Sequence, residues 1–373
     1  MPATPKGLTA RSGDVVVMVG TTKGGFLLRS DARRNGWEME GPYFPGTEMY
    51  AMAIDQRGGK NTLWAAPSSA FWGTTLRRSD DLGATWSEGE ARPVRFPEGG
   101  SLALQRIWQI APGRAEEPER MFLGVEPACL FESTDGGDSW TPVEAYLKHP
   151  HREFWAPGNG GLCLHTIVLD PKRKERMLVA QSTGGVYRTE DGGKSWKPRN
   201  VGVRVDFGPE KFPEFGQCVH KVAQHPSRPE RLFMQNHGGL YRSDDFGDEW
   251  KDIGAGVPSD FGFVMTIHPT DPDTIYIVPL DGMMRTGPDG KLRVYRSRDA
   301  GGSWEAMTRG LPQDDAYETV LRDGMDVDSL APAGVYFGTR SGKVFASADD
   351  GSSWRLVREG LPPVVCVKAA VLA

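Results

Sequence analysis

Two short segments of the sequence pair a cysteine with a histidine two residues later, Cys163-Leu164-His165 and Cys218-Val219-His220. Residues i and i+2 of a β-strand lie on the same face, so each pair would present a thiol beside an imidazole. Two cysteines with two histidines are a common ligand set for zinc. Small thiols packed in a protein core give the same pattern, and we favour that interpretation. We therefore predict no metal and no cofactor; if a metal does bind, the candidate ligands are His165 and His220, with His237 or His151 completing a site without thiols.

Acidic side chains raise the alternative of acid–base catalysis. A glycosidase needs two carboxyl groups about 5–10 Å apart. Glu126 is the first candidate, because the short turn Glu126-Pro127-Ala128 would hold it rigidly. If the chain is an enzyme, we predict Glu126, His165 and Asp323 as its catalytic residues. A sugar lyase would instead need a histidine or tyrosine base and an arginine that neutralises a substrate carboxylate. The residues of those types are Tyr50, Arg106, His165, His220 and Arg322.

An eight-residue motif that recurs along the chain indicates how these side chains are positioned. It reads Ser/Thr-x-Asp-x-Gly-x-Ser/Thr-Trp, and Glu249 replaces the second hydroxyl residue in one copy. Six near-complete copies are Ser79–Trp86, Ser133–Trp140, Thr189–Trp196, Ser243–Trp250, Ser297–Trp304 and Ser347–Trp354. A worn seventh copy, Ser30–Trp37, keeps only its two end residues. Seven copies in 373 residues give units of about 53 residues, the size of a propeller blade.

The chemistry of the motif is that of a tight turn. The Asp carboxylate accepts hydrogen bonds from nearby backbone N–H groups, and the Gly allows a positive φ. The Trp supplies a large apolar anchor. A turn of this kind between two short extended segments indicates a β-hairpin.

The motif resembles the Asp-box (BNR) repeats of sialidases, sortilin-type receptors, xyloglucanases and a photosystem assembly factor. The resemblance covers the whole chain. It implies an all-β fold, a single seven-bladed β-propeller over residues 1–373, with each box between the third and fourth strands of a blade. It also implies that the boxes lie on the face opposite the active site. We therefore expect a structural role for the box carboxylates, Asp81, Asp135, Asp191, Asp245, Asp299 and Asp349.

The two ends of the chain predict how the propeller closes. The segment Asp14–Val19 has the pattern of a second strand, and Pro363–Ala370 has that of an innermost strand. We expect the C-terminal strand to complete the first blade, which would remove an open sheet edge. Deleting the last ten residues should then unfold the protein.

Equivalent positions in the seven units predict a binding site at the mouth of the central channel, on the top face. Positions on the innermost strands include Tyr50, Arg106, His165, His220 and Phe263, and top-loop positions include Trp72, Asn236 and Arg340. We predict as ligand-binding residues Tyr50, Trp72, Arg106, Trp108, His165, His220, Asn236, His237, Arg322 and Arg340. Three long insertions, Thr141–Leu162, Pro198–Gln217 and Pro279–Leu292, are expected to lie at the same face, and long loops are often functional.

Composition excludes several partners. With 44 basic and 49 acidic residues the net charge is −5, so there is no basic footprint for nucleic acid. No apolar run approaches the ~20 residues of a membrane helix, and Met1–Ser12 lacks the apolar core of a signal peptide. The four widely spaced cysteines predict reduced thiols in a cytoplasmic protein. Seven of the eleven tryptophans are box anchors, which leaves Trp72, Trp108 and Trp155 as functional candidates beside Trp64, expected in the core.

These observations predict a cytoplasmic propeller that binds a small molecule, a glycan or a protein partner at its top face. The alternative is a glycoside hydrolase or a sugar lyase acting at the same pocket. Sialidase activity is disfavoured, because Arg106-Ile107-Trp108 lacks the proline of the sialidase Arg-Ile-Pro motif and seven units exceed the usual six blades.

Overall fold

The computed structural model describes residues 5–373, and β-strands make up almost all of their regular secondary structure. Seven four-stranded antiparallel sheets make a seven-bladed β-propeller, as predicted. The chain divides into two compact units. The first comprises the chain up to Leu123 with Phe131–Thr141 and Asp323–Ala373, and the second comprises Gly124–Leu130 and Pro142–Arg322. A single domain over residues 1–373 stays a prediction.

Three complete sheets belong to the first unit. One contains β28 (Val364–Val371), β1 (Val15–Thr21), β2 (Gly24–Ser30) and β3 (Glu38–Tyr43). Another contains β4 (Glu48–Asp55), β5 (Thr62–Ser69), β6 (Gly73–Thr74) and β7 (Arg77–Ser79). The third contains β24 (Met325–Val327), β25 (Val335–Gly338), β26 (Val344–Ser347) and β27 (Arg355–Arg358). Two short 3-10 turns, η1 (Arg57–Gly59) and η2 (Gly89–Ala91), lie between strands.

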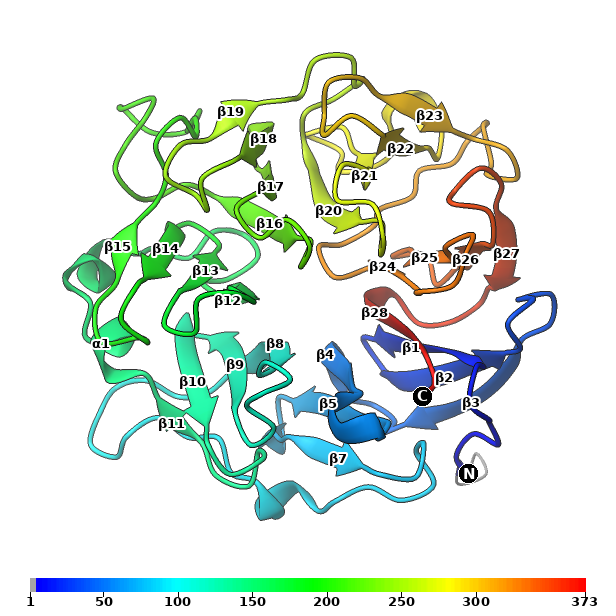
Figure 1. Cartoon of the computed structure of the whole chain (residues 1–373), viewed down its shortest axis with the longest axis horizontal. Coiled ribbons are helices and arrows are strands. Elements are labelled where there is room, and N and C mark those ends of the chain that lie inside the picture. Colours follow the sequence, from blue (N-terminus) through cyan, green and yellow to red (C-terminus); the bar gives the residue numbers. More distant parts are fainter. Residues whose placement is uncertain (1–4) are drawn as a thin grey trace. The chain divides into compact units, whose positions relative to one another are not determined.

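The predicted closure of the first blade is confirmed. Strand β28 lies antiparallel beside β1, with Val15 opposite Val371 and Val19 opposite Val367, and Figure 1 shows the red C-terminal strand next to the blue first strand. All seven residues of β1 are buried. Because β1 has β2 on its other side, the last strand satisfies a ladder of backbone groups that would otherwise form an open edge.

One blade departs from the predicted pattern of a box between the third and fourth strands. In the sheet of β4 and β5, both β6 and β7 pair with β5, so the third strand is interrupted. Within the described residues no strand follows Trp86 in this sheet. The Ser87 amide still donates to the Arg78 carbonyl at 2.8 Å, but Glu88, Gly89 and Glu90 come next, and residues of these types disfavour a strand.

A further sheet has residues in both units, and three complete sheets belong to the second unit. The shared sheet contains β8 (Arg106–Pro112), β9 (Met121–Glu126), β10 (Cys129–Ser133) and β11 (Thr141–Pro142). The second unit contains β12 (Leu164–Leu169), β13 (Met177–Gln181), β14 (Gly185–Thr189), β15 (Lys197–Pro198), then β16 (Val219–Gln224), β17 (Leu232–Asn236), β18 (Gly239–Ser243), β19 (Lys251–Asp252), and β20 (Gly262–Ile267), β21 (Ile275–Pro279), β22 (Val294–Ser297), β23 (Glu305–Met307). Its short helical turns are α1 (Glu144–Leu147), η3 (Pro150–Phe154) and η4 (Pro288–Gly290).

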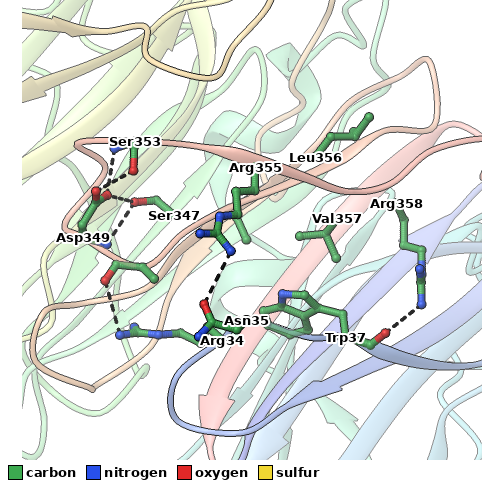
Figure 2. Close-up of a pocket in the computed structure, with 12 residues that line it drawn as sticks. Arg34, Asn35, Trp37, Ser347, Asp349, Ser353, Arg355, Leu356, Val357 and Arg358 are labelled. Carbon is green, nitrogen blue, oxygen red and sulfur yellow. Dashed lines mark hydrogen bonds between the residues drawn. The ribbon is translucent and has the colours of Figure 1, made fainter.

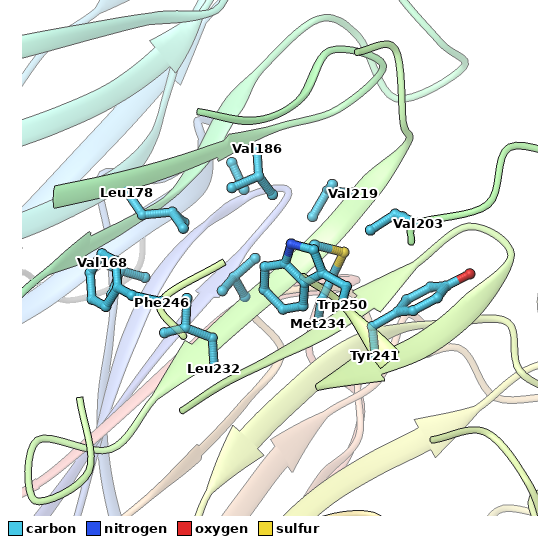
Figure 3. Close-up of a cluster of buried hydrophobic side chains, with 12 residues drawn as sticks. Val168, Leu178, Val186, Val203, Val219, Leu232, Met234, Tyr241, Phe246 and Trp250 are labelled. Carbon is cyan, nitrogen blue, oxygen red and sulfur yellow. The ribbon is translucent and has the colours of Figure 1, made fainter. Parts of the chain in front are cut away.

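Apolar side chains from adjacent sheets form the core of the second unit. One buried cluster joins Leu178 of β13 to Val219 of β16 and Met234 of β17. Figure 3 shows the ring of Trp250, a box anchor, among these side chains. The indole Nε1 of Trp250 donates to the Arg199 carbonyl of the preceding sheet's segment at 2.9 Å. This box tryptophan therefore fastens one blade to the next.

The six boxes share one hydrogen-bond pattern, except that Glu249 supplies no second hydroxyl to Asp245. In the box that follows β14, the Thr189 hydroxyl donates to Asp191 at 2.7 Å and accepts from the Gly193 amide at 2.9 Å. The same carboxylate accepts from the amide and the hydroxyl of Ser195. Gly193 has φ +95°, a conformation that favours glycine. Each box carboxylate is thus bound within its own turn, as in the equivalent bonds of Asp81, Asp135, Asp245, Asp299 and Asp349.

Candidate functional site

Three of the predicted ligand-binding residues of the first unit lie together. The rings of Tyr50 on β4 and Trp108 on β8 have centroids 4.6 Å apart. The Arg106 guanidinium lies 5.5 Å from the Tyr50 centroid, and its Nε donates to Glu48 at 2.8 Å. This arrangement offers an aromatic and cationic surface, with part of the charge of Arg106 already neutralised by Glu48.

The other predicted positions of the first unit are dispersed or engaged elsewhere. Trp72 is 87% exposed in the loop between β5 and β6, and Arg340 is exposed between β25 and β26. Asp323 is buried just before β24 and forms an ion pair with Lys368 of β28 at 3.0 Å. Burial alone would lower the pKa of Lys368, but the charge of Asp323 outweighs it and raises this pKa. The Asp323 carboxylate therefore holds the closing strand through a charged pair.

Glu126 lies at the end of β9 in the second unit and is buried. The first insertion, Thr141–Leu162, approaches it closely at Gly161. A Cβ atom at Gly161 would lie 2.1 Å from Glu126 Oε1, and Gly161 has φ +84°. Only glycine therefore fits at this close approach of the backbone to the carboxylate.

His165 on β12 is fully buried, and both of its ring nitrogens have partners. Nε2 lies 2.9 Å from the Val219 carbonyl, and Nδ1 lies 3.0 Å from the Thr166 hydroxyl. A carbonyl oxygen only accepts, so Nε2 donates to it and Nδ1 accepts from the hydroxyl. These bonds hold the ring between two sheets; a catalytic role for His165 stays a prediction.

His220 on β16 occupies the equivalent position but uses the opposite nitrogen. Its Nδ1 donates to the Gly262 carbonyl at 2.6 Å, and its Nε2 lies 3.6 Å from the Cys218 sulfur. Burial, reinforced by the charge of Arg322, lowers the pKa of His220 well below its usual value. The ring is therefore neutral at pH 7, with the lone pair of Nε2 directed at the thiol.

Cys163 and Cys218 have different surroundings although both were considered as zinc ligands. The Cys163 sulfur lies 3.2 Å from the Ser182 hydroxyl and 3.3 Å from the Arg322 guanidinium. Cys218 is half-buried and lies with His220 and His237. The structure thus groups one cysteine with two histidines, where the sequence suggested two of each.

The long insertions of the second unit contact one another through aromatic side chains. The ring of His151, from the first insertion, stacks on that of Phe215, from the second, at 4.0 Å. Phe207 of the second insertion lies 5.6 Å from His237. Asn236 donates to the Arg204 carbonyl at 3.2 Å and so holds the second insertion against β17. Trp155, a candidate from the sequence, is part of the first insertion and is buried against Tyr187.

Two phenylalanines extend this cluster and were not selected as ligand-binding residues from the sequence. Phe261 lies 5.1 Å from His237, and Phe263 lies 4.7 Å from His220. Phe263 has the same offset from its turn as His165 and His220, which was the available signal. Arg285 of the third insertion lies 6.0 Å from the Phe263 ring. The second unit therefore surrounds its cysteine–histidine group with aromatic rings.

A cavity of about 350 Å³ in the first unit is lined by none of the predicted catalytic or ligand-binding residues, although the box carboxylate Asp349 lies in its wall. It lies between the worn box and β27, and Figure 2 shows Asn35 facing Arg355 across it. Arg34, which lines the cavity, forms a buried ion pair with Asp328 at 3.1 Å. Arg358 donates to the Trp37 carbonyl at 2.9 Å. The basic side chains of the cavity therefore stabilise the contact between two blades of this unit.

Known proteins of similar sequence and structure agree with the propeller fold. No family model matches the chain. A protein of Neosartorya fischeri named as a probable oligoxyloglucan-reducing end-specific xyloglucanase is 23% identical over 263 residues, which are 62% of this chain and 30% of that protein. The chain thus spans less than a third of the length of this relative.

A second relative matches over most of its length. The photosystem II assembly lipoprotein Ycf48 of Synechococcus sp. strain CC9902 is 28% identical over 299 residues, 70% of this chain and 79% of that protein. A solved structure of YCF48 bound to a D1 peptide superposes with a TM-score of 0.53 at 15% identity, over 94% of this chain and 87% of that one. The chain is a seven-bladed β-propeller with homology to xyloglucanases and to Ycf48.

Proposed function

We propose that this protein is a binding propeller whose partner is a segment of another protein, held by the insertions of the second unit. The observation that carries the proposal is the match to Ycf48, which extends over most of both chains, and a YCF48 structure holds a peptide. The match to the xyloglucanase covers only 30% of that enzyme. A small molecule or a glycan remains the alternative ligand.

The exposed side chains of the insertions support a protein partner. Met283 is 95% exposed and Met284 is 67% exposed in the third insertion. Phe207 and Phe212 of the second insertion and Phe154 of the first are also exposed. Methionine and aromatic residues are enriched in protein interfaces, and methionine adapts its shape to different partners. An interface would remove these apolar side chains from water.

The second candidate function is a glycoside hydrolase or a sugar lyase at the same site, and the xyloglucanase similarity favours it. Two of its three predicted catalytic groups are engaged in structural contacts. His165 donates to one backbone carbonyl and accepts from a hydroxyl, and Asp323 pairs with Lys368. These contacts favour binding over catalysis.

Site-directed photocrosslinking tests the proposed interface. A photoreactive phenylalanine analogue replaces Met283 in one variant and Lys194, an exposed residue of a box turn, in the matched control. In the source cells, we expect one discrete protein adduct from position 283 and none from position 194. Equal, diffuse labelling at both positions would contradict a specific protein partner.

A panel of glycans tests the enzymatic alternative. Wild-type protein and Glu126→Gln are incubated with xyloglucan oligosaccharides and with uronate-containing oligosaccharides. We expect no turnover by either protein. Turnover by the wild type that the substitution abolishes would replace the binding proposal with the enzymatic one.

A cytoplasmic location stays a prediction, which fractionation of the source cells tests. No helix among residues 5–373 is long and apolar enough to span a membrane.

A further inference from the structure

Three potential metal ligands converge in the second unit from the ends of two paired strands. Cys218 directly precedes β16, His220 lies on β16, and His237 directly follows β17. The register places Val219 opposite Asn236, and the His237 amide donates to the Cys218 carbonyl at 2.9 Å. As a result, one ligand atom of each of the three side chains lies within 4.8 Å of the other two.

The backbone fixes the orientation and tautomer that a metal requires of His220. Because Nδ1 donates to the Gly262 carbonyl, the lone pair resides on Nε2, which points at the Cys218 sulfur. Histidine ligands in proteins characteristically donate their second nitrogen to a carbonyl or carboxylate in this way. The bond to Gly262 therefore orients the His220 ring as such a bond orients a metal-bound histidine.

The separation of the two ligand atoms also fits a metal. With Zn–S near 2.3 Å, Zn–N near 2.0–2.1 Å and tetrahedral angles, the sulfur and nitrogen of two ligands lie about 3.6 Å apart. The Cys218 sulfur and His220 Nε2 are 3.6 Å apart. A weak thiol hydrogen bond has a similar length, so the third ligand, His237, distinguishes the two explanations.

The surroundings combine apolar rings with charges of both signs. Phe207 and Phe261 pack against His237, and Phe263 packs against His220. The nearby cations are Arg322 and Arg285, which oppose a bound dication, whereas Asp206 and Asp260 act on His237 in the opposite sense. Burial raises the pKa of Cys218, and the charge of Arg322 only partly offsets that increase.

We propose that Cys218, His220 and His237 bind a zinc-type divalent ion with three protein ligands and one open position. On binding, the S–H bond of Cys218 breaks, an S–metal bond forms and the proton passes to solvent. Cys218 and His237 are half-buried, so water or a donor atom of a bound molecule can reach the fourth position. A three-ligand site with an open position has the geometry of reactive rather than purely structural zinc. This proposal does not depend on the identity of the partner.

Metal titration of the purified protein tests the site. Metal-free protein is titrated with Zn²⁺ by calorimetry and with Co²⁺ by absorption, which reports thiolate ligation through a charge-transfer band. We expect about one equivalent of either ion and a thiolate–cobalt band. Cys218→Ser should abolish the band, and His237→Ala should weaken binding by at least about 100-fold.

The matched control is Cys163→Ser, which changes the equivalent cysteine of the neighbouring blade. It should bind metal like the wild type. His237 is half-buried at the end of its strand, so its variant tests binding in a folded protein, which circular dichroism verifies. The proposal is overturned if the wild type binds less than about a tenth of an equivalent, or if Cys163→Ser loses binding as Cys218→Ser does.

Discussion

Two neighbouring blades, β12–β15 and β16–β19, carry the same Cys-x-His segment and use it differently. Both histidines bond to a backbone carbonyl of the following sheet, His165 to Val219 and His220 to Gly262. His165 bonds through Nε2 and His220 through Nδ1. The nitrogen that the carbonyl engages decides what the other nitrogen can do, so an identical motif yields a structural histidine in one blade and a potential ligand in the next.

The residues next to the two histidines explain why His165 and His220 use different ring nitrogens. Thr166 follows His165 and its hydroxyl occupies Nδ1, whereas the residue that follows His220 is Lys221. Ser182 and His237 are also equivalent, because each donates its amide to the cysteine carbonyl of its own blade. The first blade therefore surrounds its thiol with a hydroxyl, and the second surrounds it with a second imidazole.

The largest expected effect is on stability. His165→Ala leaves a buried carbonyl and hydroxyl without their partner and creates a cavity, so we expect a loss of about 3 kcal/mol in the free energy of unfolding. His220→Ala removes one carbonyl bond and should cost clearly less. Urea denaturation in the presence of a chelator measures both. Equal losses would mean that the two histidines have the same role.

The two thiols should differ in reactivity. Burial raises the pKa of both Cys163 and Cys218, so both react slowly, and access then decides the rate. Cys163 is buried and Cys218 half-buried, so a small alkylating reagent should modify Cys218 about 10-fold faster. Mass spectrometry of the digested protein follows both sites in one sample. Faster labelling of Cys163 would reverse the assignment of their environments.

Removing the hydroxyl beside His165 sharpens the comparison. Thr166→Val keeps the side-chain shape but leaves Nδ1 without its donor, and we expect a loss of about 1 kcal/mol. The equivalent change, Lys221→Val, removes no donor to a histidine nitrogen and serves as control. An unchanged unfolding midpoint for Thr166→Val would show that the hydroxyl does not fix the ring.

The smallest effect concerns the boxes of the same two blades. Although burial opposes it, the Ser195 and Thr189 hydroxyls lower the pKa of Asp191 to about 2. Because this folded-state pKa is depressed, the stability contributed by Asp191 is present above about pH 4 and is lost as the pH falls towards 2. Ser195→Ala should cost about 0.5 kcal/mol at pH 7 and nothing near pH 2.

The reciprocal change completes this test. Asp245 lacks a second hydroxyl donor because Glu249 stands where the other boxes have Ser or Thr. Glu249→Ser should therefore increase the free energy of unfolding by about 0.5 kcal/mol at pH 7. Urea unfolding at pH 7 and near pH 2 measures both variants, and a pH-independent effect would argue against the carboxylate as the acceptor.

The fold was predictable because its signal is local. Each box places its hydroxyl, carboxylate and glycine within eight residues, so the repeat predicted seven sheets. The strand patterns at the two ends of the chain predicted the pairing of β28 with β1. The interrupted blade after Trp86 was not predicted, because its box is intact and only the residues that follow it depart from the pattern.

The candidate site was predictable only as a set of residue types. Cys218, His220 and His237 were all noted, but their grouping depends on the β16–β17 register and on the Gly262 carbonyl from a third strand. The sequence equally allowed Cys163 and His165 to join them. Their exclusion from the group follows from contacts with Ser182, Arg322, Thr166 and Val219, which no spacing rule reports.

Because β28 pairs with β1, the first blade can be completed only after β28 has been synthesised. Strand β1 ends at Thr21 and its partner β28 begins at Val364, so β1 leaves the ribosome long before β28. At roughly 5–20 residues per second, the nascent chain carries an incomplete first blade for about 20–70 seconds. During that time an apolar strand with unpaired amides can pair with another nascent chain. Translation speed and chaperone supply, rather than final stability, would then limit the yield of folded protein.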